Sequence, residues 1–155
     1  MFRGPSSVLL DAKNRLAIPT RFREEIITRC EGRMIVTVNR PRCLLLFPMP
    51  EWEVLERQLM RLPSMKKRER KVRRSLLGMA AEIEMDGHGR ILLPAAHRRF
   101  AGLEREVALV GQGNMFEIWD EQRWFESTDQ WLDEADGDDG DDDGAPSEAL
   151  ESLVF

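Results

Sequence analysis

The sequence predicts an α+β fold in which one small module occurs twice, followed by an acidic tail. The phrase LDAKNRLAIP at 10–19 recurs as MDGHGRILLP at 85–94, and both copies keep an Asp, an Arg four residues on and a Pro four beyond that. After each phrase, short apolar stretches and helix-period stripes follow in the same order. The charges are also segregated, because residues 1–125 contain 23 Lys or Arg against 16 Asp or Glu, whereas 126–155 contain 12 acidic residues and no basic one.

The first copy begins with two short strands around a tight turn. SVLL and LAIP have strand-like composition, and DAKNR between them places Asn14 where a turn needs a left-handed residue. Pro19 ends the second strand and suits the first turn of a helix over 19–30, where its missing N–H has no partner to lose. RMIVTVN and CLLLFP then predict two strands joined by RPR, and residues 50–62 predict a helix with one apolar stripe of Trp52, Leu55, Leu59 and Leu62.

The second copy repeats this order of elements. Its predicted strands and helices are AEIEM, ILLP, the helix PAAHRRFAGL, REVALVG, MFEIWD and the helix DEQRWFESTDQWLDE, with Asp120 as the helix cap. Phe47 of the first copy corresponds to Trp119, and Trp52 to Trp124. Neither half has enough apolar surface for a core of its own, so we expect the halves to share one core about a pseudo-twofold axis.

The predicted organisation is a first module over 1–62, a basic connecting helix over 63–80, a second module over 81–132 and a disordered tail over 133–155. The connecting region is the most basic part of the chain, with nine Lys or Arg between Arg57 and Arg74. Such a helix is either a solvated face, a surface that flanks nucleic acid, or a subunit interface formed with SLLGMAAEI. The tail is rich in Asp and Gly, a composition that is costly to order.

The repeated D-x-x-x-R phrase has a structural and a functional interpretation. An Asp that opens a turn accepts hydrogen bonds from the N–H groups of that turn, so Asp11 and Asp86 could simply stabilise it, each paired with its own Arg. In the functional interpretation, Arg15 and Arg90 lie at protruding tips with five donors in water, free for phosphate oxygens or for guanine O6 and N7. The basic residues around the first tip, and the net charge of +7 over 1–125, favour a polyanionic partner.

MFRG at the start, LDAKNRLAIPTRFR, MDGHGRILLP and FEIWDEQRW together resemble the MraZ family, relatives of the AbrB-type DNA-binding proteins. The resemblance covers about residues 1–132. It implies two AbrB-like swapped-hairpin modules that form a split β-barrel with short helices, assembled into a homo-oligomeric ring. It also implies a cytoplasmic, nucleoid-associated transcriptional regulator that binds double-stranded DNA, at short direct repeats in the promoter of the division and cell-wall gene cluster. The acidic tail is not part of the family pattern.

The resemblance assigns the DNA-binding role residue by residue. Arg15 and Arg90 match the arginines of the two motifs, with Asp11 and Asp86 as their turn residues. The additional DNA-binding candidates, basic or titratable residues near the turns in sequence, are Lys13, Arg3 and His88.

Other functional classes find less support in the sequence. No nucleophile motif or Gly-rich phosphate loop is present, so we expect no enzymatic activity, catalytic residue, small-molecule substrate or cofactor. Cys30 and Cys43 have no metal-ligand spacing and read as core thiols, and the apolar runs are too short for a membrane span. The alternative is an antitoxin-like protein-interaction module of AbrB type.

Overall fold

The computed structural model describes residues 1–40, 42–63 and 65–134, and it has the α+β class that the sequence predicts. The strands in these ranges are β1 (Phe2–Leu9), β2 (Arg15–Ala17), β3 (Arg33–Asn39), β4 (Cys43–Pro48), β5 (Ala81–Glu84), β6 (Arg90–Leu92), β7 (Glu106–Gly113) and β8 (Phe116–Asp120). The helices are α1 (Thr20–Cys30), α2 (Met49–Met60), α3 (Lys67–Leu76), α4 (Ala95–Ala101) and α5 (Glu121–Asp133). Residues 1–124 form one compact unit, and the rest of α5 belongs to a second unit. The tail predicted over 133–155 lies outside the described residues apart from its first two.

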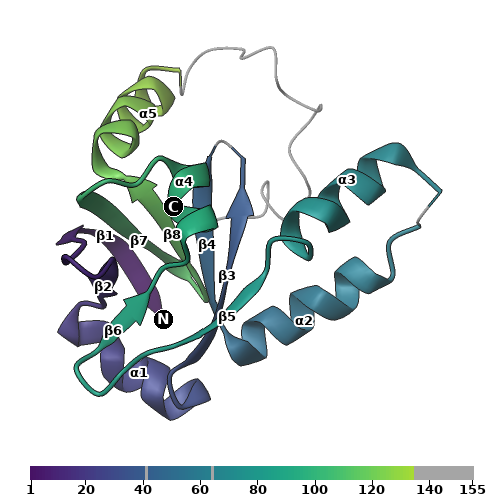
Figure 1. Ribbon diagram of the computed structural model, residues 1–155. Helices are drawn as coiled ribbons and strands as arrows, with labels where there is room; N and C mark the ends of the chain where they lie inside the picture. Colours follow the sequence, from purple (N-terminus) through teal and green to yellow (C-terminus); the bar gives the residue numbers. More distant parts are fainter. Residues whose placement is uncertain (41, 64, 135–155) are drawn as a thin grey trace, which may run out of the picture. The chain divides into compact units, whose positions relative to one another are not determined.

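Six antiparallel strands form the main sheet in the order β1-β7-β8-β4-β3-β5 (Figure 1). The order reads the same from both ends when each strand is replaced by its counterpart in the other copy. At the centre β4 pairs with β8, through Leu44 with Ile118 and Leu46 with Phe116. The expected pseudo-twofold arrangement is therefore present in the strand order itself.

A separate two-stranded ribbon, formed by β2 and β6, contains the strands that follow the two repeated turns. The sequence predicts that each turn joins a hairpin, and this is wrong beyond a single bridge between Leu10 and Leu16. β1 instead pairs with β7, and β5 with β3, so each copy supplies strands to the other. Over the described residues the strands form this open sheet and ribbon, and no closed barrel is present.

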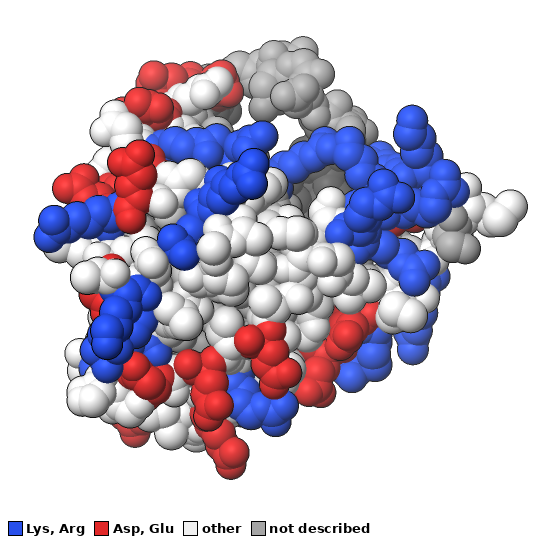
Figure 2. All heavy atoms as spheres, viewed as in Figure 1, with Lys and Arg blue, Asp and Glu red and all other residues white. Residues whose placement is uncertain are grey.

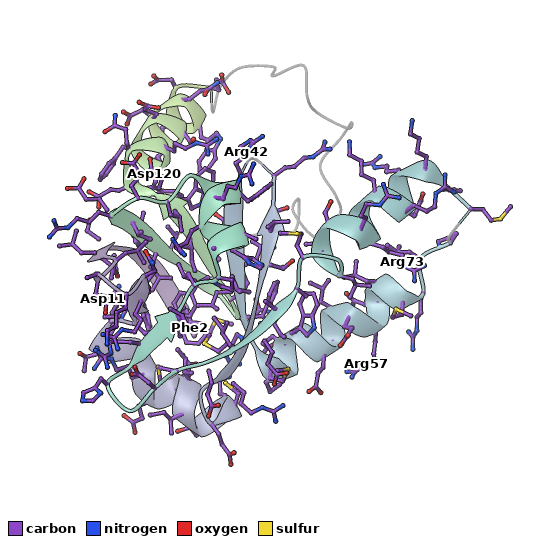
Figure 3. All side chains as sticks on the ribbon, in the orientation of Figure 1. Phe2, Asp11, Arg42, Arg57, Arg73 and Asp120 are labelled. Carbon is purple, nitrogen blue, oxygen red and sulfur yellow. The ribbon has the colours of Figure 1, made fainter. Side chains whose placement is uncertain are left out.

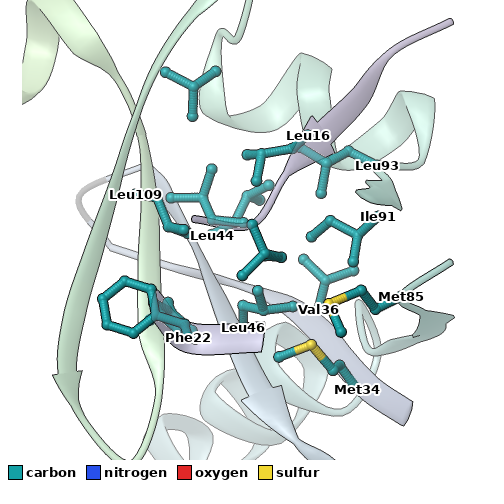
Figure 4. Close-up of a cluster of buried hydrophobic side chains, with 14 of the residues drawn as sticks. Leu16, Phe22, Met34, Val36, Leu44, Leu46, Met85, Ile91, Leu93 and Leu109 are labelled. Carbon is teal, nitrogen blue, oxygen red and sulfur yellow. The ribbon is translucent and has the colours of Figure 1, made fainter. Parts of the chain in front are cut away.

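The shared core lies between the main sheet, the ribbon and α1 (Figure 4). Alternate residues of β3 and β4, such as Val36 and Leu46, face this cluster and meet Leu16, Ile91 and other ribbon and turn residues. The intervening residues of the same strands face a second cluster under α2, because successive side chains of a strand point to opposite faces. Every strand of the ribbon thus has one buried side chain: Leu16 and Ile91 are 0% exposed.

The second cluster contains the aromatic pairs that the sequence comparison aligns. Phe47 and Trp52 have ring centroids 5.7 Å apart with an interplanar angle of 55°, and Trp119 and Trp124 have 5.8 Å and 59°. Asp120 caps α5 through a bond from the Arg123 N–H. These matched geometries confirm that the two copies fold alike.

Two elements differ most from their predicted boundaries. β1 starts at Phe2 rather than at residue 7, although Gly4 and Pro5 argue against a strand; Pro5 is tolerated because β1 is an edge strand and its missing N–H costs no ladder bond there. The connecting helix is shorter than 63–80, since α3 covers Lys67–Leu76 only. The Thr37 hydroxyl donates to the Leu76 carbonyl at 2.7 Å, which ties the end of α3 to β3.

Candidate nucleic-acid interface

The two repeated turns have the same hydrogen bonds. In the first, Asp11 Oδ1 accepts from the N–H groups of Lys13 and Arg15, both at 2.9 Å. In the second, Asp86 Oδ1 accepts from the N–H groups of His88 and Arg90, at 2.8 and 2.9 Å. The backbone also closes identically, with the N–H of each Asp donating to the carbonyl of its own Arg. The structural interpretation of the Asp is therefore confirmed in both copies.

Each turn also needs one left-handed residue, and the two copies meet that need differently. Asn14 has φ 62° and Gly89 has φ 76°, and each donates its N–H to the carbonyl of the turn's Asp. Asn and Gly are the residues that adopt this conformation at least cost. Asn14 thus serves the turn as the sequence predicts.

Each Arg forms an ion pair with the Asp of its own turn. Arg15 Nε lies 2.7 Å from Asp11 Oδ2, and Arg90 Nε lies 3.0 Å from Asp86 Oδ2. Hydrogen bonds from the Arg15 backbone N–H, the Arg15 side chain and the Lys13 N–H keep the pKa of Asp11 below its ordinary value of 3.8. The pKa of Asp86 is lowered in the same way, first by the Arg90 backbone N–H. Both carboxylates are therefore charged partners at neutral pH.

This pairing corrects the expectation that all five donors of each Arg lie in water. Nε is used inside the turn, and the two side chains are only 28% and 29% exposed. Within the described residues Arg15 makes no other side-chain hydrogen bond, while one terminal nitrogen of Arg90 lies 3.4 Å from His88 Nδ1. A guanidinium anchored through Nε keeps its terminal N–H fork for an external acceptor and loses little side-chain freedom on binding.

The ribbon brings the two arginines together from opposite copies. β2 and β6 are antiparallel, with Arg15 opposite Leu92 and Ala17 opposite Arg90. Since Leu16 and Ile91 point into the core, the other four residues share the outer face. Arg15 and Arg90 are then diagonal neighbours, a relationship that places residues roughly 7–8 Å apart. The two turns belong to one composite surface.

Two further residues belong to this surface: Arg23, one of the basic residues near the first turn in sequence, and Leu92, which the sequence does not single out. Arg23, from α1 of the first copy, donates from Nε to the Ile18 carbonyl and lies against Gly89 of the second turn. Leu92 is 57% exposed beside the two arginines. In the sequence, Arg23 is marked only by its position after TRF, and Leu92 only by the alternating pattern of ILLP. Neither signal reveals the contact between the two copies that brings these residues to the surface.

The remaining candidates divide into those near the turns and one that is distant. Lys13 and His88 are exposed within the turns themselves. Arg3 is exposed near the start of β1, whereas the first turn follows the end of that strand. The strand from Arg3 to Leu9 spans roughly 20 Å at the usual rise, so Arg3 is not part of the ribbon surface.

The basic residues of α3 form a second cationic surface. Figure 2 shows Lys and Arg concentrated over α3, with a smaller group over β2 and α1. Arg73 and Asp11 lie at opposite sides of the view in Figure 3. A hollow of about 470 Å³ beside α3 has an apolar floor that includes Val38, Val72 and Phe100. The connecting helix is thus separate from the ribbon surface.

Other kinds of site find no support in the part of the chain that is described. No group of three His, Cys, Asp or Glu is placed there to hold a metal ion. In the same ranges no helix is both long and apolar enough to cross a membrane. Cys30 and Cys43 are buried and form no disulfide, and burial raises the pKa of Cys43 to about 12, which leaves its thiol unreactive.

Comparison with known protein families identifies the family to which this chain belongs. The family model described as "MraZ protein, putative antitoxin-like" matches the chain twice, at residues 1–75 and 76–142. The chain belongs to the MraZ family. The two matches also confirm the two-copy organisation, and the second extends past residue 132.

Proteins named "Transcriptional regulator MraZ" match over most of their length. The chain is 49% identical to the one from Thioalkalivibrio sulfidiphilus, over 99% of both chains. It is 53% identical to that of Methylococcus capsulatus, over 87% of this chain and 89% of the relative, and 46% identical to that of Halorhodospira halophila, over the full length of both. The alignments with the first and third of these relatives extend into the tail sequence, whereas the second covers less of the chain.

Proposed function

We propose that this chain is a transcriptional regulator that binds double-stranded DNA with the outer face of the β2–β6 ribbon and the two turns beside it. The observation that carries the proposal is the placement of Arg15 and Arg90 on one face, each held through Nε by the Asp of its own turn. The terminal N–H forks remain for guanine O6 and N7 or for phosphate oxygens. The names of the relatives support the same function.

The shape of the ribbon supports docking in the major groove. A two-stranded β-ribbon fits that groove, and each good bidentate Arg contact with a base discriminates by about 1–3 kcal/mol. Lys13 and His88 extend the surface toward the sugar-phosphate backbone of the DNA, where contacts add affinity without reading the base sequence. Arg3 belongs to this proposal only as a distant phosphate contact, because it lies at the far end of β1.

One ribbon has few contacts, so an assembly is part of the proposal. A homo-oligomeric ring would present identical ribbons at regular spacing, and direct repeats in the promoter of the division and cell-wall gene cluster would engage several at once. Linked contacts then multiply through effective concentration. A regulator bound to promoter DNA in this way would be cytoplasmic and associated with the nucleoid.

Footprinting on the DNA upstream of the gene tests the proposal. We expect protection of short repeats by the full chain, and loss of protection by the double variant Arg15→Ala, Arg90→Ala. Arg61→Ala, an exposed arginine at the end of α2, is the matched control and should protect normally. Folding and subunit number are measured for all three proteins by circular dichroism and light scattering.

Equal protection by the double variant would contradict the ribbon as the DNA-binding surface. Absence of any protection at low salt by the full chain would contradict DNA binding itself. The antitoxin-like alternative, which the wording of the family description keeps open, predicts instead a stable complex with the product of a neighbouring gene that forms without DNA.

A further inference from the structure

Leu92 has an unusual position for an exposed leucine. Its neighbours in sequence, Ile91 and Leu93, are 0% and 1% exposed and fill the core, whereas Leu92 is 57% exposed. Exposed single leucines are common, so exposure alone means little. The exposure of Leu92 is informative because the strand register places Leu92 directly opposite Arg15 on the outer face of the ribbon.

A cross-strand pair has the dimensions needed for two adjacent bases. Side chains opposite one another have Cβ atoms about 4.5–5.5 Å apart, and stacked bases of one strand are about 3.4 Å apart. When Arg15 reaches a guanine, Leu92 therefore faces the next base step. The apolar group that the major groove offers is the C5 methyl of thymine, which aliphatic side chains contact.

The two copies differ at this position. Arg90 lies opposite Ala17, whose side chain is a single methyl group. The ribbon thus combines two equivalent arginines with apolar partners of unequal size, and a contact with a thymine methyl is favoured on the Arg15 side.

We infer that Leu92 is a specificity-determining residue that recognises the C5 methyl of a thymine next to the base contacted by Arg15. This inference rests on the proposed function, since it requires the ribbon to lie in the major groove. It adds a preference that arginine contacts alone do not provide.

Deoxyuridine substitution tests the inference, because it removes only the methyl group of thymine. Each thymine of the footprinted duplex is replaced singly, and binding of the full chain is measured by fluorescence anisotropy. One substitution should weaken wild-type binding about three- to fivefold, as expected for one buried methyl group. Leu92→Ala should bind the thymine duplex more weakly than wild type and bind both duplexes equally.

Val54→Ala, which changes an exposed apolar residue on α2, is the matched control and should keep the full response to deoxyuridine. If no deoxyuridine duplex distinguishes wild type from Leu92→Ala, the inference is wrong; the proposed function still stands if Arg15→Ala loses binding. If Arg15→Ala binds normally, the proposed function fails with it. A changed subunit number for Leu92→Ala would show that Leu92 is a subunit contact and would also overturn the inference.

Discussion

The guanidinium of Arg23 lies directly against Gly89, although the two residues come from different copies of the module. A Cβ on Gly89 would overlap Arg23 Nε, which donates to the Ile18 carbonyl at 2.7 Å. The Gly89 carbonyl accepts from the Ile18 N–H at 2.8 Å, so the helix of one copy and the turn of the other meet at a single residue. The second turn therefore depends on the first copy for its environment.

Gly89→Ala should lower the stability of the protein. The substitution forces alanine into a left-handed conformation, at about 1–2 kcal/mol, and displaces Arg23 as well. Gly87→Ala is the control in the same turn, since a Cβ at Gly87 meets no atom within 4 Å and its φ is not positive. Urea unfolding of both variants measures the difference, and equal midpoints would contradict the role assigned to Gly89.

Acid should release the first turn. The folded pKa of Asp11 is lowered, so its contribution to stability is complete above the ordinary value of 3.8 and is lost as pH falls through the lower, folded value. Asp11→Asn should therefore melt at a lower temperature than wild type at pH 7, with a smaller difference near pH 3. Melting curves between pH 7 and pH 3 measure this, and a difference that is independent of pH would argue against the carboxylate's role.

Arg15→Ala should weaken specific DNA binding more than Arg90→Ala. Lys13 adds charge beside Arg15, and Arg15 has the exposed Leu92 opposite it, whereas a terminal nitrogen of Arg90 approaches His88. Binding of both variants to the protected duplex is compared at equal salt, after folding and subunit number have been checked. A larger loss for Arg90→Ala would reverse the ranking, and Arg15→Lys separates loss of charge from loss of the fork.

Deletion of residues 135–155 should tighten DNA binding at low salt. The deletion removes eight carboxylates, which repel phosphate and compete with it for basic residues, and it leaves the described part of α5 intact. The gain should be larger for scrambled than for operator DNA, because carboxylates carry no base information. A salt titration of both proteins on both duplexes checks this; superimposable curves would leave only solubility as the tail's contribution.

The sequence predicts the type of nearly every element and much less of their pairing. Turn chemistry identifies the two D-x-x-x-R loops, and the apolar stripe of Trp52 and Leu59 identifies α2, since both signals are local. The start of β1 is missed because Pro5 is unfavourable in a strand unless that strand is an edge, which only the sheet order reveals.

The candidate site also contains some residues that local patterns predict and others that only the strand pairing reveals. Asp11 and Arg15 can be paired from their spacing alone, whereas the neighbours Arg23 and Leu92 require the register of β2 against β6. That register joins residues about seventy-five positions apart and is fixed by burial of Leu16 and Ile91 on the inner face. Long-range strand exchange is the part of this fold that local patterns do not encode.

The pairing of β2 with β6, one strand from each copy, has a consequence for synthesis of the chain. A ribosome that has translated Arg15 to Ala17 has made only one strand of the ribbon, and the other strand follows when Arg90 to Leu92 have left the exit tunnel. Prematurely terminated or cleaved chains therefore carry one arginine motif without the paired surface. If the ribbon binds DNA as proposed, fragments of the chain would lack that ability, since only chains whose second half has been completed carry both strands.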